Sequence, residues 1–349
     1  MLPKIIIALV LVVVASAAGL WVLNGAPKTD QIKKPATVKR IGIVQYQKIF
    51  EPSIKGFKDG LAESGYKEGE NVSYDVRLAD GNKDKLKEGA DYFLNQNVDL
   101  IFADSPESAS SALNESTRSG KTNIPIVFTN GTNPDKVGII KSFKSSGNNT
   151  TGVAVDFAAI TTKKLEFLKR INPTIKKVGV VYGAVSDPTA DFNMKVLREA
   201  ATKFDINLVE YKLLKPPGPL SAQEAQKLVD SLKPGDFDAY FHPAGPVVNF
   251  PDTKKVLMGI GKKLKVPTVF TRDFDPKEES WLLSYGHDFF ETGKQAAEIA
   301  AKVLGGTKPA DIPIEYQKKI RLIVDLRAAK EIGVTIPESI LAIADKRIE

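Results

Sequence analysis

The sequence alternates short apolar runs rich in β-branched residues with longer amphipathic stretches, in two successive rounds. This alternation is typical of βαβ units, in which parallel strands form a sheet and the connecting helices cover its faces. With 349 residues and 42% apolar content, the chain is long enough to build two separate cores. We therefore expect an α/β protein made of two doubly wound parallel-sheet lobes.

The first round runs from residue 39 to about 143, and the second from about 161 to 271. In the first round, strands are predicted at 41–45, 72–78, 100–103, 126–129 and 137–143, and helices at 54–64, 84–96 and 106–117. In the second round, strands are predicted at 178–182, 208–212, 239–242 and 268–271, and helices at 161–170, 191–204, 221–232 and 253–264.

The remaining chain is too short for a third domain, with a helix predicted at 290–304, a strand at 321–324 and a short helix at 328–332. Such a tail is explained if it crosses back and completes both lobes. We expect hinge crossings near 151–158, 283–287 and 316–321, which would let the lobes close on a ligand as rigid bodies. The predicted division is 1–38 as an N-terminal segment, 39–153 with 286–316 as lobe I, and 154–285 with 317–349 as lobe II.

The amino terminus carries an uncharged run of 19 residues, Ile5 to Leu23, behind Lys4. This length can span a bilayer as a helix. A cleaved signal peptide is the alternative, with Ala15-Ser16-Ala17 as its cleavage site. Because the apolar run continues past that site, we favour an uncleaved anchor, and either interpretation places the body of the protein outside the cytoplasm. Residues 28–38 then form a polar tether.

The composition argues against several kinds of function. The chain has no cysteine and two histidines, which leaves no thiolate nucleophile and disfavours zinc sites. The net charge of +7 is spread along the chain, so nucleic-acid binding is not expected. Nucleophile-elbow, phosphate-loop and His-Glu-x-x-His motifs are missing from the sequence. We predict a binding protein without a cofactor or metal rather than an enzyme.

In an open parallel sheet, ligands bind beyond the carboxyl ends of the strands. The loops predicted at those ends are rich in small, polar and aromatic residues. The candidate ligand-binding residues are Gln45, Tyr46, Phe50, Ser105, Ser108, Thr129, Asn130, Gly131, Thr132 and Asn133 in the first round, and Tyr182, Ser186, Asp187, His242, Ala244, Gly245, Arg272 and Asp273 in the second.

A structural role is the alternative for each of these loops. Ser105 precedes Pro106 as a helix N-cap, so the exposed N–H groups there either bind a carboxylate or are only capped. Asp273 and Arg272 either bind a zwitterion or pair with each other. Strand-end aromatic residues either stack on a ligand or fill the core.

Several segments resemble one known family. They are IGIVQYQ (41–47), GFKDGLAESGYKEGENV (56–72), VDLIFADSPESASSA (98–112), IPIVFTNGTNPDKVGIIKSF (124–143), NNTTGV (148–153), VGVVYG (178–183) and GKQAAEIAAKVLGGTKPADIPIE (293–315). The chain from about residue 39 to 344 thus resembles the ABC-transporter substrate-binding proteins of the TrpX-like, aromatic amino-acid-binding type, which have a type I periplasmic-binding-protein fold.

The resemblance implies a small amino-acid-like ligand between the lobes, with its carboxylate near Ser105 and Ser108 and its other polar end near residues 129–133. It also implies delivery to a membrane permease driven by a cytoplasmic ATPase. We expect the protein itself to be a monomer. The sequence departs from the family in two places: His242-Pro243-Ala244-Gly245 replaces an Asp-Asn pair, and Asn133 stands where Asp is common.

Two other functions fit the same fold. A membrane-anchored sensor ectodomain would pass ligand occupancy to a signalling partner. An exported hydrolase would depend on His242.

Overall fold

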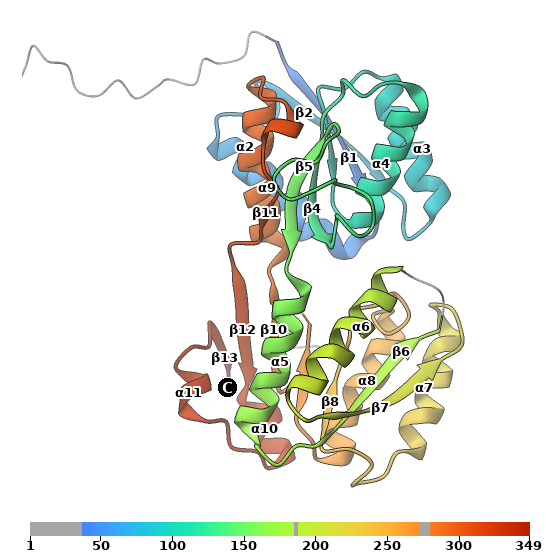
Figure 1. Ribbon diagram of the computed structural model, residues 1–349, viewed down its shortest axis with the longest axis vertical. Coiled ribbons are helices and arrows are strands. Elements are labelled where there is room, and N and C mark those ends of the chain that lie inside the picture. The colour runs from blue at the N-terminus through green and yellow to red at the C-terminus, as the bar shows by residue number, and fades with distance from the viewer. Residues whose placement is uncertain (1–36, 185–187, 272–279) are drawn as a thin grey trace, which may run out of the picture. The chain divides into compact units, whose positions relative to one another are not determined.

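The computed structural model describes residues 37–184, 188–271 and 280–349. Val38–Glu349 form one compact unit, which Figure 1 shows as a ribbon. Within the described ranges, every helix is too short or too polar to cross a lipid bilayer. The predicted anchor at residues 5–23 lies outside the described residues.

The first lobe is built on a six-stranded sheet with the order β11-β5-β4-β3-β1-β2, in which all paired neighbours are parallel. Its strands are β1 (Lys39–Gln45), β2 (Val72–Leu78), β3 (Leu100–Ala103), β4 (Ile126–Thr132), β5 (Thr150–Val155) and β11 (Glu315–Tyr316). Its helices are η1 (Lys48–Phe50), α2 (Glu51–Glu63), α3 (Lys83–Asn95), α4 (Pro106–Ser119), α9 (Phe289–Leu304) and η2 (Pro309–Asp311).

The second lobe is built on a seven-stranded sheet with the order β13-β12-β10-β9-β8-β6-β7, in which β12 pairs with β10 in the antiparallel direction. Its strands are β6 (Lys177–Gly183), β7 (Asn207–Leu213), β8 (Ala239–Phe241), β9 (Thr268–Phe270), β10 (Leu283–His287), β12 (Ile320–Asp325) and β13 (Lys346–Ile348). Its helices are α5 (Phe157–Ile171), α6 (Pro188–Lys203), α7 (Pro219–Ser231), α8 (Pro251–Leu264), α10 (Leu326–Ile332) and α11 (Glu338–Leu341).

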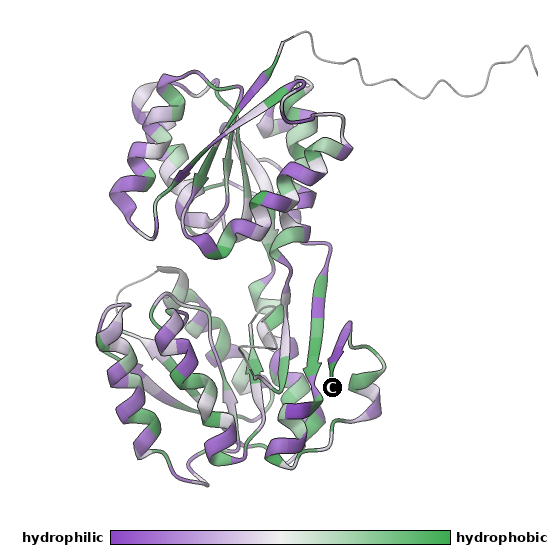
Figure 2. Cartoon of the chain, turned by 180° about the vertical axis from the view of Figure 1, so that it is seen from behind, coloured by the Kyte–Doolittle hydropathy of each residue, from purple (hydrophilic) through white to green (hydrophobic). Residues whose placement is uncertain are grey.

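Each sheet has an apolar core on both faces. In the first lobe, α2 and α9 cover one face and α3 and α4 the other. In the second lobe, α5, α6, α10 and α11 cover one face and α7 and α8 the other. Apolar residues accordingly gather on the strands and the inner sides of the helices (Figure 2). The two doubly wound lobes expected from the sequence are confirmed.

Helices α2 and α9 pack unusually closely because glycines face each other at their contact. A Cβ built on Gly56 would lie 1.9 Å from the carbonyl oxygen of Phe290, and one on Gly293 would lie 2.0 Å from that of Ser53. Only glycine fits at either position without moving backbone. The close approach brings the start of α9 beside the start of α2.

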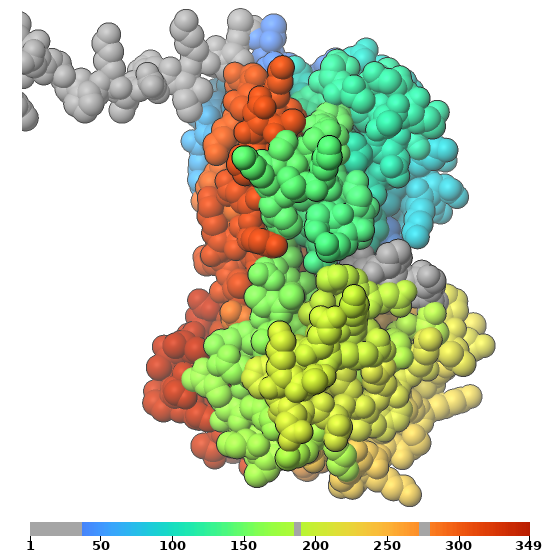
Figure 3. Space-filling view, viewed as in Figure 1, coloured from blue at the N-terminus to red at the C-terminus, as the bar shows by residue number. Residues whose placement is uncertain are grey.

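The chain passes between the lobes three times: from β5 to α5 at 155–157, from β10 to α9 at 287–289, and from β11 to β12 at 316–320. These crossings form the waist of the molecule (Figure 3). Asp288 at the second crossing caps α9, accepting from the N–H groups of Phe290 and Glu291, and it pairs with Arg321 of β12 at 2.8 Å. The multi-strand hinge expected from the sequence is confirmed.

One predicted strand was wrong. Residues 137–143 form turns rather than a strand, and their apolar side chains, such as Ile139 and Ile140, are buried under a backbone that bonds to the Pro134 carbonyl and to the Ser145–Ser146 turn. The fifth strand along the chain is instead β5, which begins at Thr150. Strands β10, β11 and β13 and helix α11 were also not predicted.

Candidate functional site

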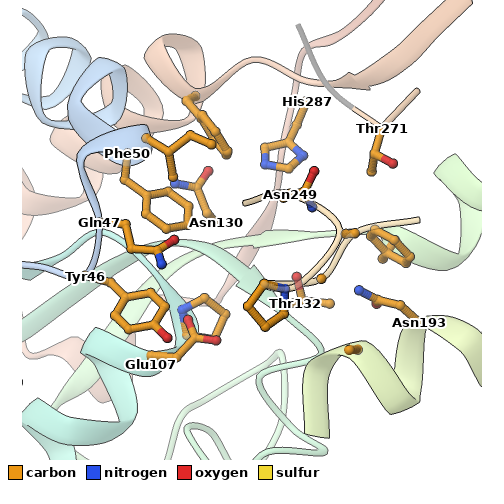
Figure 4. A pocket seen from close by; sticks show the side chains of 18 residues that line it. Tyr46, Gln47, Phe50, Glu107, Asn130, Thr132, Asn193, Asn249, Thr271 and His287 are labelled. Atoms are coloured by element: carbon orange, nitrogen blue, oxygen red, sulfur yellow. The ribbon is translucent and has the colours of Figure 1, made fainter. Parts of the chain in front are cut away.

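A cleft that is partly open to solvent, with an empty volume of about 960 Å³, lies at the carboxyl ends of strands from both sheets. Figure 4 shows its side chains from close by. The lining residues are Tyr46, Gln47, Ile49, Phe50, Pro106, Glu107, Asn130, Thr132, Phe157, Ala190, Asn193, Ala244, Gly245, Pro246, Asn249, Thr271, His287 and Phe289. Both lobes and two of the three crossings therefore contribute to one cavity.

The cleft sits where the strand order reverses in each sheet. In the first lobe, this point lies between β1 and β3. The loop after β1 supplies Tyr46, and the first turn of α4, which follows β3, supplies Glu107. In the second lobe, it lies between β6 and β8, and the loop after β8 supplies Ala244 and Gly245. Loops diverge at such points and leave a crevice, so the position of the cleft follows from the topology.

A row of aromatic rings runs along one side of the cleft. Phe50 precedes α2 and Phe289 begins α9, and their ring centroids lie 5.1 Å apart. The ring of Phe289 also meets the ring of His287 at 5.1 Å, nearly edge to face. The close packing of α2 on α9 thus sets the spacing of this row.

Asn130 is positioned by an irregularity in β4, where the pairing with β5 shifts register between Phe128 and Gly131. Its φ of 57° lies in the left-handed region, which Asn tolerates better than most residues. Its amide nitrogen donates to the Ser53 hydroxyl and the Asp104 carbonyl, both at 2.9 Å, and its oxygen accepts from Thr292 at 2.7 Å. These bonds make Asn130 a fixed part of the cleft wall.

Asp104 lies behind this wall and is fully buried. Its carboxylate accepts from the backbone N–H of Tyr46, at 3.0 and 3.2 Å, and from the hydroxyl of Ser108 at 2.9 Å. Burial away from water raises the pKa of Asp104 to about 7, although these hydrogen bonds act in the opposite direction. Asp104 thereby ties the loop after β1 to the start of α4.

Ser105 and Ser108 do not line the cleft. The Ser105 hydroxyl accepts from the Ser108 backbone N–H, as the predicted N-cap should, and donates to the Ser108 hydroxyl at 3.1 Å. Both residues are fully buried. The adjacent Pro106 and Glu107 face the cleft instead, and the carboxylate of Glu107 lies beside the Tyr46 ring (Figure 4).

His242 is also buried behind the wall, in the second lobe. Its ring lies within hydrogen-bond distance of the Tyr240 hydroxyl (3.2 Å) and the Asn249 side-chain oxygen (3.3 Å), and its carbonyl accepts from the Thr271 hydroxyl at 2.8 Å. The expected position of this histidine in the cleft is thus corrected: it orients Asn249 and Thr271, which do line the cleft.

Two polar groups of the second lobe have unmet hydrogen-bonding capacity. Asn193 of α6 lines the cleft, is 3% exposed, and has no partner for its side-chain oxygen among the described residues. Lys164 of α5 is fully buried just behind Thr271, and burial lowers the pKa of its ammonium group to about 7.

The structure brings six of the predicted site residues into the cleft: Tyr46, Phe50, Asn130, Thr132, Ala244 and Gly245. It places eight others outside the lining: Gln45, Ser105, Ser108, Thr129, Gly131, Asn133, Tyr182 and His242. Four lie outside the described residues: Ser186, Asp187, Arg272 and Asp273.

The residues that sequence reasoning missed come mainly from the crossings and from helix faces. Phe157, His287 and Phe289 lie at or next to crossings, so the predicted hinge segments were a usable signal for them. Asn193 lies inside a helix, and its sequence context carries no comparable signal. Among the described residues, no group of three His, Asp or Glu side chains is placed to hold a metal ion.

Comparison with known proteins gives concordant matches. Residues 43–348 match the family described as ABC transporter substrate binding protein. The tyrosine-binding protein of Clostridioides difficile (strain R20291) is 27% identical over 323 residues, which cover 90% of this chain and 88% of that protein.

Solved structures show the same fold. The ligand-free, open structure of a substrate binding protein with adhesive properties from Clostridium difficile has a TM-score of 0.70 at 25% identity, covering 89% of this chain and 100% of that one. An ABC domain from Streptococcus pneumonia, in complex with L-Trp, has a TM-score of 0.75 at 23% identity, with the same coverage. The expected type I periplasmic-binding-protein fold is confirmed.

Proposed function

Because the chain belongs to the ABC transporter substrate-binding protein family, we propose that it binds a small amino-acid-like ligand with an aromatic side chain in the cleft between its lobes. As a substrate-binding protein it is not an enzyme. The ligand is carried unchanged to a permease in the membrane, which a cytoplasmic ATPase drives. The tyrosine-binding protein that is 27% identical supports an aromatic amino acid as the cargo.

The observation that carries this proposal is the make-up of the cleft wall. Tyr46, Phe50, Phe157 and Phe289 line it together with amide and hydroxyl groups. Aromatic rings prefer offset or edge-to-face contacts at centroid distances of roughly 4.5–7 Å, and the row of Phe50 and Phe289 offers such a surface to an aromatic side chain.

The charge of the wall fits the ammonium end of an amino acid. Glu107 is the one carboxylate among the described residues that line the cleft, and this lining includes no lysine or arginine. An ammonium group near Glu107 would gain a charge-assisted hydrogen bond, which is stronger than a neutral one. We assign to Glu107 the binding of the ligand's ammonium group, because the Asp-Asn pair that the family usually has after β8 is replaced here by His242-Pro243-Ala244-Gly245.

The protein acts outside the cytoplasm, and we propose that residues 5–23 anchor it to the membrane as an uncleaved helix. We propose residues 39–153 with 286–316 as one closing body and 154–285 with 317–349 as the other, in a monomer. Closure about the three crossings would bury the ligand between Glu107 of the first lobe and Asn193 of the second.

Thermal unfolding with a ligand panel tests the proposal. The panel contains L-tyrosine, L-tryptophan, L-phenylalanine, L-leucine and D-ribose. A ligand at 100 times its Kd stabilises the folded protein by about 2.7 kcal/mol, which gives a measurable rise in Tm. We expect this rise with an aromatic L-amino acid, and a panel in which no amino acid raises Tm would refute the proposal.

Titration calorimetry of F50A then locates the site. Loss of one stacking ring is worth about 1 kcal/mol, so Kd should rise roughly fivefold. Y92A is the matched control, because Tyr92 is a partly exposed ring on α3 that lies outside the cleft lining. An unchanged Kd in F50A, or an equal loss in Y92A, would remove the rings of the cleft from the proposal.

A further inference from the structure

Lys164 is a fully buried lysine in the wall that the second lobe contributes to the cleft. It lies in the middle of α5, and its Nζ lies 4.4 Å from the ring centroid of Phe241 and 5.5 Å from that of Phe157. Within the described chain, its one hydrogen bond goes to the hydroxyl oxygen of Thr271 at 3.4 Å. Phe157 and Thr271 both line the cleft, so the ammonium group sits one layer beneath the cleft surface.

No carboxylate pairs with Lys164 in the described part of the chain. The Thr271 hydroxyl donates its hydrogen bond to the His242 carbonyl, so its oxygen accepts from Lys164 and carries no charge. A lysine has three N–H donors, and a buried ammonium without a counter-charge is strongly unfavourable. A residue of Met shape and size would fill this place at lower free energy, so packing alone does not account for a lysine here.

Two other buried polar atoms, on α5 and α6, lack a hydrogen-bond partner among the described residues. The hydroxyl of Thr161, one turn earlier on the same face of α5, is buried and has no partner among the described residues. The side-chain oxygen of Asn193 in the facing helix α6 is in the same state. Unpartnered polar atoms are rare in protein interiors, and one of these two, on Asn193, lines the cleft beneath which Lys164 lies, so a ligand in the cleft could complete it.

The opposite wall sets the direction of that ligand. Glu107 of the first lobe repels a carboxylate at the start of α4. The hydroxyls of Ser105 and Ser108 are already engaged there, because Ser105 donates to Ser108 and Ser108 donates to Asp104. We propose that Lys164, which lies behind Thr271, is the counter-charge for the ligand's carboxylate. A zwitterionic ligand then lies across the cleft with its ammonium group on Glu107.

This inference rests on the proposed function and makes it more specific. The ligand then links the two lobes, because its ammonium group is bound by the first lobe and its carboxylate by the second. The carboxylate moves from the start of α4, where the family resemblance placed it, to the wall formed by α5 and Thr271.

The test compares acids with their amides. Titration calorimetry measures Kd for L-tyrosine, L-tyrosinamide and 3-(4-hydroxyphenyl)propionate, and for the tryptophan counterparts L-tryptophan and L-tryptophanamide, with the wild type and K164M. We expect the wild type to prefer each amino acid to its amide by about tenfold or more, the value of a hydrogen bond between charged groups. In K164M the affinity for the acid should fall by the same factor while that for the amide stays, which removes the preference.

T271V is the second variant, because it removes the oxygen that holds Nζ without changing the charge, and we expect a smaller loss for the acid alone. Equal binding of acid and amide by the wild type overturns the inference even if K164M does not fold, and it leaves the proposed function intact. Retained acid preference in folded K164M overturns it as well. If no amino acid binds, the proposed function fails. Binding of 3-(4-hydroxyphenyl)propionate by the wild type that is lost in K164M would still support the carboxylate site. If no acid of any kind binds, both the proposed function and the carboxylate site are overturned.

Discussion

The close contact of α2 with α9 makes a substitution of glycine by alanine informative at Gly293. The new Cβ would lie 2.0 Å from the carbonyl oxygen of Ser53, 2.7 Å from its carbonyl carbon and 2.8 Å from its Cα. Ordinary carbon–oxygen contact needs about 3.3 Å, and all three atoms belong to backbone. The two helices must therefore separate by about 1 Å.

The expected free energy of unfolding follows from two opposing effects. Overpacking against backbone costs about 3 kcal/mol, and alanine in a helix interior returns about 1 kcal/mol relative to glycine. We expect G293A to be less stable by about 2 kcal/mol, with Tm lower by roughly 4 °C. Separation of the helices would also move Ser53, which accepts from Asn130, and would widen the gap between Phe50 and Phe289, so ligand affinity should fall too.

G259A is the matched control, because Gly259 is an exposed helical glycine in α8, and a methyl carbon added to it would have no neighbouring atom within 4 Å. The same substitution there should stabilise the protein by about 0.5–1 kcal/mol. Urea unfolding followed by circular dichroism measures both variants. A G293A protein as stable as the wild type, with G259A stabilised, would show that the helix contact is looser than described.

Variants at three further positions test the hinge and the buried charges. D288A removes the N-cap of α9 and its ion pair with Arg321 and should cost about 1–2 kcal/mol in urea unfolding, whereas D288N keeps the cap and should lose less. The pKa of Asp104 is raised to about 7, so between about pH 4 and 7 the folded state holds a proton that the unfolded state has lost. The free energy of unfolding of the wild type should therefore fall as the pH rises from about 4 to 7, and that of D104N should fall less. Lys164 has its pKa lowered to about 7, so without ligand the wild type should gain stability relative to K164M from about pH 7 to 10.5, and a flat difference would refute the buried position.

Most of the fold was predictable because its strands are short apolar runs and its helices are amphipathic. Strands β2 and β3 and the three crossings were placed from these patterns. Strand β5 was not predicted because it begins with two polar residues, Thr150 and Thr151. Their hydroxyls donate to the carbonyls of Ile139, 11 residues earlier, and Ile312, 161 residues later. The strand predicted at 137–143 was wrong for the opposite reason, because apolar side chains can be buried from turns as well as from strands.

The site was less predictable than the fold. The rule that ligands gather at strand ends found Tyr46, Asn130 and Gly245. It does not say which polar groups at those ends face outwards: Ser105 and His242 were chosen for their chemistry, and both turn inwards to bond with their neighbours. Nor does the rule reach Lys164, whose importance depends on which groups surround it rather than on its local sequence.

The three crossings also have a consequence for the order in which the chain is made. Asn130 bonds to Thr292, 162 residues further along, and the first lobe lacks both α9 and β11 until that later stretch exists. At typical ribosome speeds of about 5–20 residues per second, the apolar face of α2 waits roughly 12–50 s for α9, which follows it by about 240 residues. The first lobe is therefore completed only after most of the chain has been made.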